Sequence, residues 1–281
     1  MRFKSKISTT LITCLLMLLW PSLVLADLML YPTRVVMEKN QRAAQVEIVN
    51  RGTKPETYRI SLVNRRMSET GEIVEVKEAQ TGEQFANDMV RYSPRQVTLQ
   101  PGVAQTVRIN VRKPAELAAG EYRSHLQFDR VPDAAGQSDI ESLAKPEEGQ
   151  IAIVLQALIG ASIPVIVRHG DTSATAALEN LQLEPTQEET LPILGFTIRR
   201  DGNRSLYGDL IAEYTPTGGK PIEVGKVNGV AVYVPNALRK ARLPLKLPEG
   251  ASLKNGTLTL RFMDRPEAGG KLISQAELAL P

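Results

Sequence analysis

The chain is 281 residues long and holds 34 Lys and Arg against 31 Asp and Glu, with a single Cys and a single Trp. Its formal net charge of +3 comes from the first 26 residues, which contain three basic residues and no acidic ones, so the remainder is formally neutral. A neutral chain has no global electrostatic attraction for a polyanion, so nucleic acid is not an expected partner. A single cysteine also excludes a small disulfide-rich domain.

The first 26 residues have the pattern of a secretory signal peptide. A basic start formed by Arg2, Lys4 and Lys6 precedes an apolar stretch over residues 9–25 and a motif of small residues. We expect cleavage before Asp27 and export, which in a Gram-negative cell means the periplasm. We expect no membrane insertion of the mature chain, whose length of about 255 residues suits two domains.

After the signal, short stretches of alternating apolar and polar residues are separated by Gly, Pro and Asn, a pattern that predicts β-strands. Because a proline donates no backbone hydrogen bond, the stretch around Pro94 is expected to be an edge strand or irregular. This pattern of short strands and turns, with almost no helical periodicity, is typical of an immunoglobulin-like sandwich. The segments expected in this half are 28–38, 43–50, 56–64, 71–78, 90–99, 106–112 and 120–131.

Residues 150–168 form the longest apolar stretch of the mature chain. The seventeen residues 151–167 carry no charge, and every odd position among them is apolar. A period of two with many β-branched residues favours a strand. The alternatives are an ordinary core strand and a transmembrane helix, although Gln156 and Pro164 interrupt the latter. Natural edge strands are usually guarded by charge, so an unguarded row this long indicates a strand offered to another polypeptide.

The rest of the chain has the same pattern of short strands and turns, with a less regular alternation of apolar and polar residues. Residues 237–240 suggest a helical turn. We therefore predict an all-β protein with two immunoglobulin-like sandwich domains, over residues 27–169 and 170–281. The strands expected in the second domain are 174–183, 193–200, 207–214, 224–234, 243–247, 257–263 and 273–280.

Motifs of catalysis are missing from the sequence. There is no nucleotide-binding loop, no G-x-S-x-G and no HExxH. The two histidines, His125 and His169, are far apart in the chain, so neither a zinc site nor a Ser–His hydrolase is indicated. We expect no metal, no cofactor and no enzymatic activity.

Several segments together resemble the periplasmic chaperones of the chaperone–usher pilus pathway. Residues 32–36 (PTRVV) are similar to a T-R-x-V pattern in the first strand of that family. Residues 94–109 contain L-Q-P-G-x-x-Q-T-V-R-I, which resembles the most specific motif of the family. Residues 121–132 resemble its strand that ends in a hydrophobic residue and Pro, and residues 150–168 resemble its long donor strand. The resemblance covers residues 28–170, and extends to the second domain only through architecture and a Met263-Asp264 turn.

This resemblance implies a boomerang of two domains that binds pilus or fimbrial subunits by donor-strand complementation and delivers them to an outer-membrane usher. In that mode a chaperone strand completes the sheet of a subunit that lacks its last strand. The residues implied to fill the groove of the subunit are Ile153, Leu155, Ala157 and Ile159.

The resemblance also implies how the terminal carboxylate of a subunit is held. Arg34 matches an arginine that anchors it, but the family's second base, a lysine, is replaced by Pro164. Either Arg34 acts alone, or a base such as Arg168 substitutes, or the subunit is held differently. Glu121, Arg168 and Asp264 match an interdomain charge cluster, the alternative being three separate surface charges.

Two other functions remain open from sequence alone. One is a structural or adhesive envelope protein without chaperone activity, and the other is a hydrolase built on a β-sandwich. The scarcity of aromatic residues, 5% of the chain, disfavours sugar binding by an adhesive protein. Which subunit and usher are the partners, and whether the free protein caps itself as a dimer, also stay open.

Overall fold

The computed structural model describes residues 28–132, 160–184, 191–248 and 252–281. The expected signal peptide and the first part of the long apolar stretch, residues 150–159, lie outside these ranges. Apart from one short 3-10 turn, η1 (Pro266–Ala268), the regular structure in these ranges is β-strand. No helix in them combines the length and apolar character that crossing a membrane takes.

The first domain is a sandwich of two sheets whose order follows the immunoglobulin pattern. One sheet runs β1-β3-β8-β6 and the other runs β2-β10-β9-β4-β5, with β7 also pairing β4. This reproduces the A-B-E-D and G-F-C orders of an immunoglobulin fold. The strands are β1 (Leu28–Tyr31), β2 (Val35–Met37), β3 (Ala43–Asn50), β4 (Glu56–Met67), β5 (Ile73–Val76), β6 (Val90–Ser93), β7 (Gln96–Leu99), β8 (Ala104–Val111), β9 (Gly120–Val131) and β10 (Gly160–His169).

Two prolines mark the places where the first domain changes sheets. The stretch expected to form one strand over 28–38 is two strands, because Pro32 lies between β1, which pairs β3, and β2, which pairs β10. Pro94 lies between β6, which pairs β8, and β7, which pairs β4. Proline has no N–H to continue a ladder, so the chain leaves one sheet there and joins the other.

The second domain is a smaller sandwich of the same type. Its sheets run β11-β12-β15 and β14-β13-β16-β17, which correspond to A-B-E and C′-C-F-G. The helical turn predicted at residues 237–240 is wrong: Leu238, Arg239 and Lys240 begin β15 and pair with β12. The strands are β11 (Ala174–Glu184), β12 (Ile193–Gly202), β13 (Leu206–Pro216), β14 (Ile222–Val232), β15 (Leu238–Pro244), β16 (Gly256–Asp264) and β17 (Leu272–Leu280).

The described part of the long apolar stretch is β10, a strand and not a membrane helix. It pairs antiparallel with β9 from Gly160 to His169, and parallel with β2 beside Val165–Val167 only. Ile163 and Val165 are buried in the core of the first sandwich. From Ile163 to Val167 the odd row is therefore enclosed by its own domain, whereas Ala161 is half-buried. Ile166 faces the other way and is equally buried, against the second domain.

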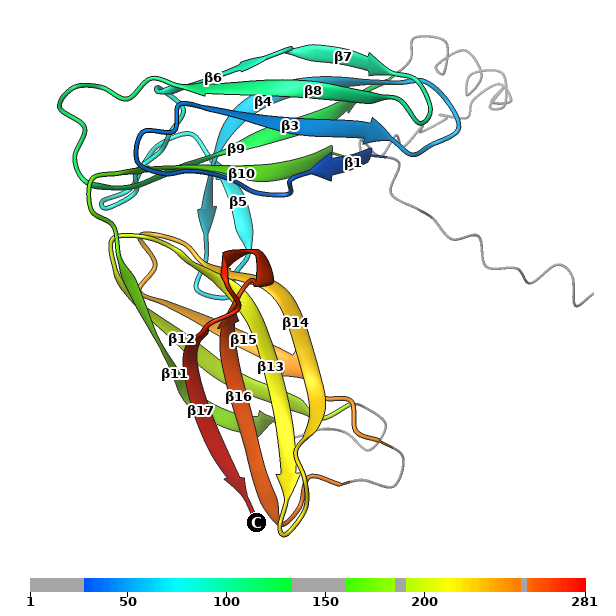
Figure 1. Cartoon of the computed structure of the whole chain (residues 1–281), viewed down its shortest axis with the longest axis vertical. Coiled ribbons are helices and arrows are strands. Elements are labelled where there is room, and N and C mark those ends of the chain that lie inside the picture. Colours follow the sequence, from blue (N-terminus) through cyan, green and yellow to red (C-terminus); the bar gives the residue numbers. More distant parts are fainter. Residues whose placement is uncertain (1–27, 133–159, 185–190, 249–251) are drawn as a thin grey trace, which may run out of the picture.

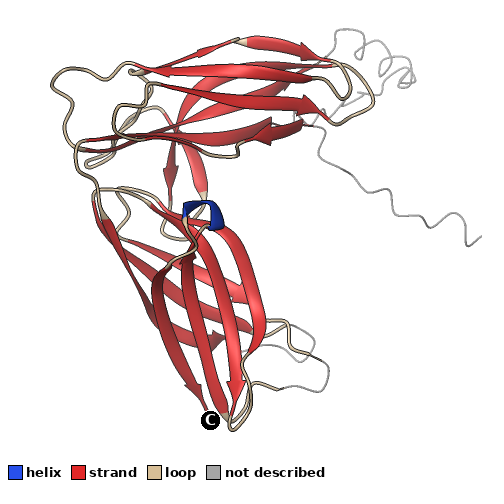
Figure 2. Ribbon diagram, viewed as in Figure 1, coloured by secondary structure: helices blue, strands red, loops and turns tan. Residues whose placement is uncertain are grey.

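The two sandwiches meet at an angle, and the C-terminus lies at the far end of the second one (Figure 1). Figure 2 shows η1 at the end of the second sandwich that is nearest the first. A small buried cluster joins the domains, with Met67 and Ile166 from the first and Ala231 and Tyr233 from the second. The predicted fold class, two immunoglobulin-like sandwiches in a boomerang, is confirmed.

Candidate functional site

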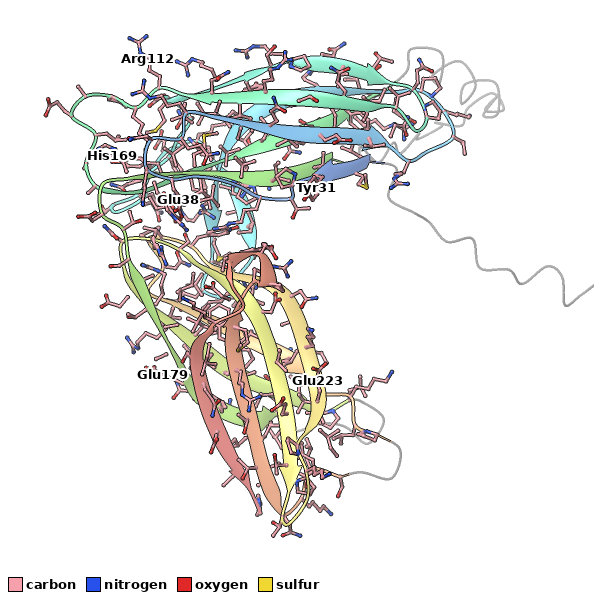
Figure 3. The ribbon with its side chains drawn as sticks, viewed as in Figure 1. Tyr31, Glu38, Arg112, His169, Glu179 and Glu223 are labelled. Carbon is pink, nitrogen blue, oxygen red and sulfur yellow. The ribbon has the colours of Figure 1, made fainter. Side chains whose placement is uncertain are left out.

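A cavity of about 920 Å³ lies in the angle between the two domains, and we call it the elbow cavity. Its first-domain wall comes from the turn between β1 and β2, from β2, and from Arg168 near the end of β10. Its second-domain wall comes from Arg204–Tyr207 and from the chain around η1. Figure 3 labels Tyr31 and Glu38, two residues of the first wall, on the side of the first sandwich that faces the second.

Arg34 reaches into the elbow cavity from the segment just before β2. Its guanidinium carbon lies 4.4 Å from the ring centre of Tyr207 and 5.4 Å from that of Tyr233. Its Nη1 donates a hydrogen bond of 3.1 Å to the Tyr233 hydroxyl, whereas Nη2 is buried without a partner among the described residues. Two rings of the second domain thus hold a first-domain cation by cation–π contact and leave one donor free.

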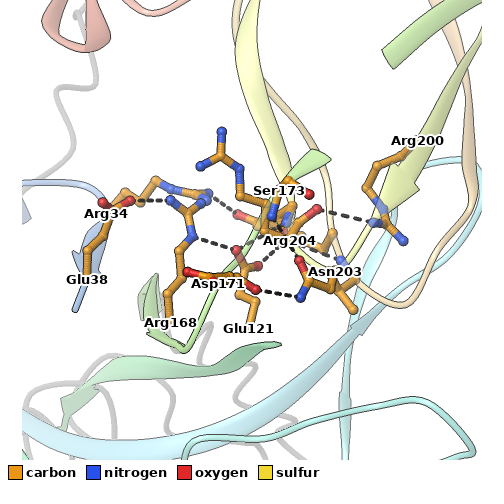
Figure 4. Close-up of polar contacts among 12 residues, drawn as sticks. Arg34, Glu38, Glu121, Arg168, Asp171, Ser173, Arg200, Asn203 and Arg204 are labelled. Atoms are coloured by element: carbon orange, nitrogen blue, oxygen red, sulfur yellow. Dashed lines mark hydrogen bonds and ion pairs between the residues drawn. The ribbon is translucent and has the colours of Figure 1, made fainter. Parts of the chain in front are cut away.

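Glu121 and Arg168 form the polar connection at the floor of the elbow (Figure 4). The Nε of Arg168 lies 3.0 Å from Glu121, and its Nη1 lies 2.5 Å from Glu38. The Glu121 side chain is 1% exposed and also accepts hydrogen bonds from the backbone N–H and the hydroxyl of Ser205, a residue of the second domain. A carboxylate buried this deeply must be paired, so these bonds fix the two domains against each other.

Asp264 is not brought to the other two residues of the expected cluster. It lines the elbow cavity, and its backbone N–H bonds the carbonyl of Lys271, but its side chain makes no ion pair with any described residue. Both oxygens of Glu121 already accept bonds from Arg168 and Ser205, and a second carboxylate beside them would be repelled. Ser205, and not Asp264, is the second-domain residue that contacts Glu121. Nothing in the sequence of its turn, D-G-N-R-S, indicates that role.

Positive charge accumulates on the face of β9 that looks toward the second domain. The guanidinium carbon of Arg123 lies 3.8 Å from the ring centre of Tyr233, and burial lowers the pKa of Arg123. The pKa of His125, two residues on, is lowered to about 3, first by burial and then by the charges of Arg123, Arg65 and Arg34. His125 is therefore neutral at neutral pH.

The resemblance to the pilus chaperones predicted a second base at the position of Pro164. Pro164 pairs with His125 across the β9–β10 ladder and brings neither a charge nor an N–H donor. Arg168, the base further along β10, is occupied by Glu121 and Glu38. The four expected groove-filling residues, Ile153, Leu155, Ala157 and Ile159, lie outside the described residues.

The β4–β5 hairpin makes a further contact between the domains. At its tip, the Glu69 carbonyl accepts a 2.7 Å bond from the Lys240 N–H. The Met67 carbonyl accepts a 2.9 Å bond from the Asn236 amide. The sequence predicted a strand over residues 71–78 but gave no sign that the tip of this hairpin docks on β15. Together with the Glu121–Ser205 contact it sets the angle of the elbow.

The comparisons with known proteins concern the fold. No protein-family model matches the chain, and a search of curated proteins finds no match. Among solved structures, the YadV chaperone is 13% identical, with 91% of this chain and 100% of that chain covered and a TM-score of 0.47.

Two further solved structures are of the same kind. One is the complex of CsuC and CsuE, a chaperone and a tip adhesion subunit from archaic chaperone–usher Csu pili of Acinetobacter baumannii, at 11% identity, 91% and 98% coverage and a TM-score of 0.45. The other is the CupB2 chaperone of Pseudomonas aeruginosa, at 12% identity, 90% and 100% coverage and a TM-score of 0.43. Likeness at this distance carries no information about the site. In the described part of the chain, no group of three His, Cys, Asp or Glu is placed to hold a metal ion.

Proposed function

We propose that this protein is a periplasmic chaperone, not an enzyme, which binds pilus or fimbrial subunits by donor-strand complementation and delivers them to an outer-membrane usher. The observation that carries the proposal is an open sheet edge. β10 has β9 along its whole described length, but β2 lies beside Val165–Val167 only. In the described part of the chain, the other edge of residues 160–164 has no strand beside it.

An open edge with unpaired backbone groups is a template for another strand. The residues that precede this edge in the sequence, 151–159, carry no charge, and their odd positions are apolar. Ile153, Leu155, Ala157 and Ile159 continue the odd row that, along β10, is buried in the first core. When a client strand pairs along this edge, these apolar side chains would fill the part of the client's core that its missing strand would otherwise supply. Each of the three larger side chains, Ile153, Leu155 and Ile159, would contribute about 1.5–3 kcal/mol when buried there, before the cost of association.

Arg34 supports the second part of the proposal, an anchor for the terminal carboxylate of the client. Its guanidinium lines the elbow cavity and has one buried nitrogen without a partner among the described residues. Tyr207 and Tyr233 fix its position, so little side-chain entropy is lost when an anion binds. A carboxylate is the anion whose two oxygens suit the planar guanidinium.

The test is capture of a co-expressed pilus subunit that lacks its last strand, with the same subunit carrying a restored strand as the negative control. Leu155→Glu places a charge in the apolar row. This charge would lose its hydration when the row is buried in the subunit, so we expect capture to fall at least about tenfold. Gln156→Glu introduces the same carboxylate one position away, on the opposite face of the strand, and serves as the matched control.

The proposal requires that Gln156→Glu captures the subunit as the parent does and that both variants keep the circular dichroism and melting temperature of the parent. Undiminished capture by folded Leu155→Glu would exclude donation by this strand. Equal loss in both variants would mean that the strand does not present alternate faces to the client.

A further inference from the structure

Four arginines line the elbow cavity: Arg34 and Arg168 from the first domain, and Arg204 and Arg265 from the second. Two of them are already neutralised. Arg168 bonds two carboxylates, at 2.5 and 3.0 Å. Arg265 bonds two others, at 2.8 and 3.2 Å. An incoming anion gains little from a guanidinium whose donors are engaged in this way.

Arg34 and Arg204 differ from this pair because neither has a carboxylate partner among the described residues. Arg34 is held by aromatic rings and by the Tyr233 hydroxyl, and its buried Nη2 has no partner there. Arg204 lies in the turn between β12 and β13. Its carbonyl accepts a 3.1 Å bond from Arg200, but its guanidinium makes no hydrogen bond or ion pair with any residue in the described ranges. One free cation therefore lines the cavity from each domain.

We infer that a carboxylate binds between Arg34 and Arg204, so that the anchor for the chain end of a client spans both domains. The identity of the ligand as a client rests on the proposed function, whereas the two-arginine site rests on the cavity itself. A planar carboxylate accepts two parallel N–H bonds from each guanidinium that it faces. A singly charged ligand also suits the cavity better than a phosphate, because Asp264 lines it without an ion pair among the described residues and repels a second negative charge.

The position of Arg204 follows from the contact that joins the domains. Ser205, the next residue, bonds Glu121 of the first domain through both its N–H and its hydroxyl. This contact holds the turn that carries Arg204 over the first-domain wall, and Figure 4 draws the two arginines together with Glu121 and Arg168. β10 supplies no alternative, since Pro164 is uncharged and Arg168 is needed to neutralise Glu121. Arg204 is thus the second base.

The experiment is an NMR titration of the mature full-length chain with acetate at constant ionic strength, following the Nε–H signals of the arginines. Acetamide, which has the same shape and no charge, is titrated in parallel. We expect saturable shifts at Arg34 and Arg204 with acetate and none with acetamide. Arg34→Gln and Arg204→Gln should each weaken acetate binding by about tenfold. Lys271→Gln, which removes a positive charge that does not line the cavity, should change it less than about twofold.

Each other result overturns the inference. Shifts confined to Arg34, or no saturable shift at all, would mean that Arg204 is not part of a carboxylate site. Equal weakening by Lys271→Gln would mean that acetate responds to the general field of the molecule. The titration of the parent chain needs no variant, so it decides the matter even if Arg204→Gln fails to fold.

The same variants separate this inference from the proposed function. If the subunit is captured normally by Arg204→Gln and acetate leaves Arg204 unmoved, the inference fails and the chaperone function stands. If acetate binds as expected but no strand-deficient subunit is captured, the chaperone function fails and the two-arginine site remains as a carboxylate site.

Discussion

At the scale of single residues, the elbow combines charges that are fully paired with charges that are not. Glu121 is almost completely buried and accepts three hydrogen bonds, so its charge is neutralised within the molecule. Arg34 and Arg123 are instead held against the ring of Tyr233, without a carboxylate bonded to either in the described ranges. Cation–π contact stabilises a guanidinium without consuming its donors. The paired charges therefore hold the domains together, and of the two arginines without a carboxylate only Arg34 lines the elbow cavity.

His125 gives a prediction at this scale. Its folded-state pKa of about 3 lies below the usual 6.5 because burial and three nearby arginines disfavour its charged form. Above pH 6.5 His125 is neutral in both the folded and the unfolded state, so its ionisation does not lower the free energy of unfolding. As the pH falls from 6.5 toward 3, only the unfolded state binds the proton, and stability is lost at up to about 1.4 kcal/mol per pH unit.

Replacing His125 by Gln should therefore flatten the pH dependence of stability within that window. The measurement is the free energy of unfolding by urea at pH 7, 5.5 and 4.5 for the parent and His125→Gln, with His169→Gln, a half-buried histidine at the end of β10, as the control. The variant need not be as stable as the parent, because the slope is what counts. A slope for His125→Gln as steep as that of the parent would show that His125 is protonated in the folded state.

At the scale of elements, the sequence located strands well wherever the local pattern had a single interpretation. The ranges expected for β3 and β9, 43–50 and 120–131, are those observed. It failed where partners distant in the chain decide the structure. Residues 237–240 have helix-forming side chains, yet they extend because β12 offers a free edge to pair with. Likewise, Ser205 and the β4–β5 tip acquire their roles only when the second domain comes near, which no local pattern encodes.

The β4–β5 tip gives a prediction at this scale. Gly71 closes the turn with a φ of +88°, a conformation that costs other residues about 1–3 kcal/mol, and a Cβ there would press on the Arg239 guanidinium of β15. Gly71→Ala should therefore both destabilise the turn and loosen the hairpin from the second domain. Hydrogen exchange at the Lys240 N–H, which bonds Glu69, reports the docking.

The matched control for this change is Gly218→Ala in the turn between β13 and β14. Gly218 has a φ of +73° and open space around its Cα, so it carries the backbone cost without a contact. We expect exchange at Lys240 to accelerate in Gly71→Ala and to stay at the parent rate in Gly218→Ala. Unchanged exchange in both would mean that the tip does not hold the elbow.

At the scale of the whole molecule, two sandwiches that fold by the same local rules become one functional unit at their junction. Neither domain alone forms the elbow cavity, because each contributes one wall and one unpaired arginine. The open edge of β10 and this cavity lie at the two ends of one strand, since β10 begins at Gly160 and Arg168 is near its end. A client strand running along β10 would thus reach the cavity with its terminus, which links the proposed strand donation to the proposed anchor.

This geometry depends on the ion pair between Arg168 and Glu121, whose side chains are 13% and 1% exposed. Removing the cation by Arg168→Met leaves the buried carboxylate of Glu121 without its ion-pair partner, so we expect a loss of about 3–5 kcal/mol in the free energy of unfolding. The double variant Arg168→Met with Glu121→Gln should recover part of this loss, because no buried charge is then left without a partner.

The control is Arg242→Ala, which breaks an ion pair whose arginine is 65% exposed and should cost less than about 1 kcal/mol. Urea unfolding of the four proteins measures these differences, and small-angle scattering reports the angle between the domains. If Arg168→Met is as stable as Arg242→Ala, or the double variant is no better than the single one, the ion pair does not hold the elbow and the position of Arg204 must be set by other contacts.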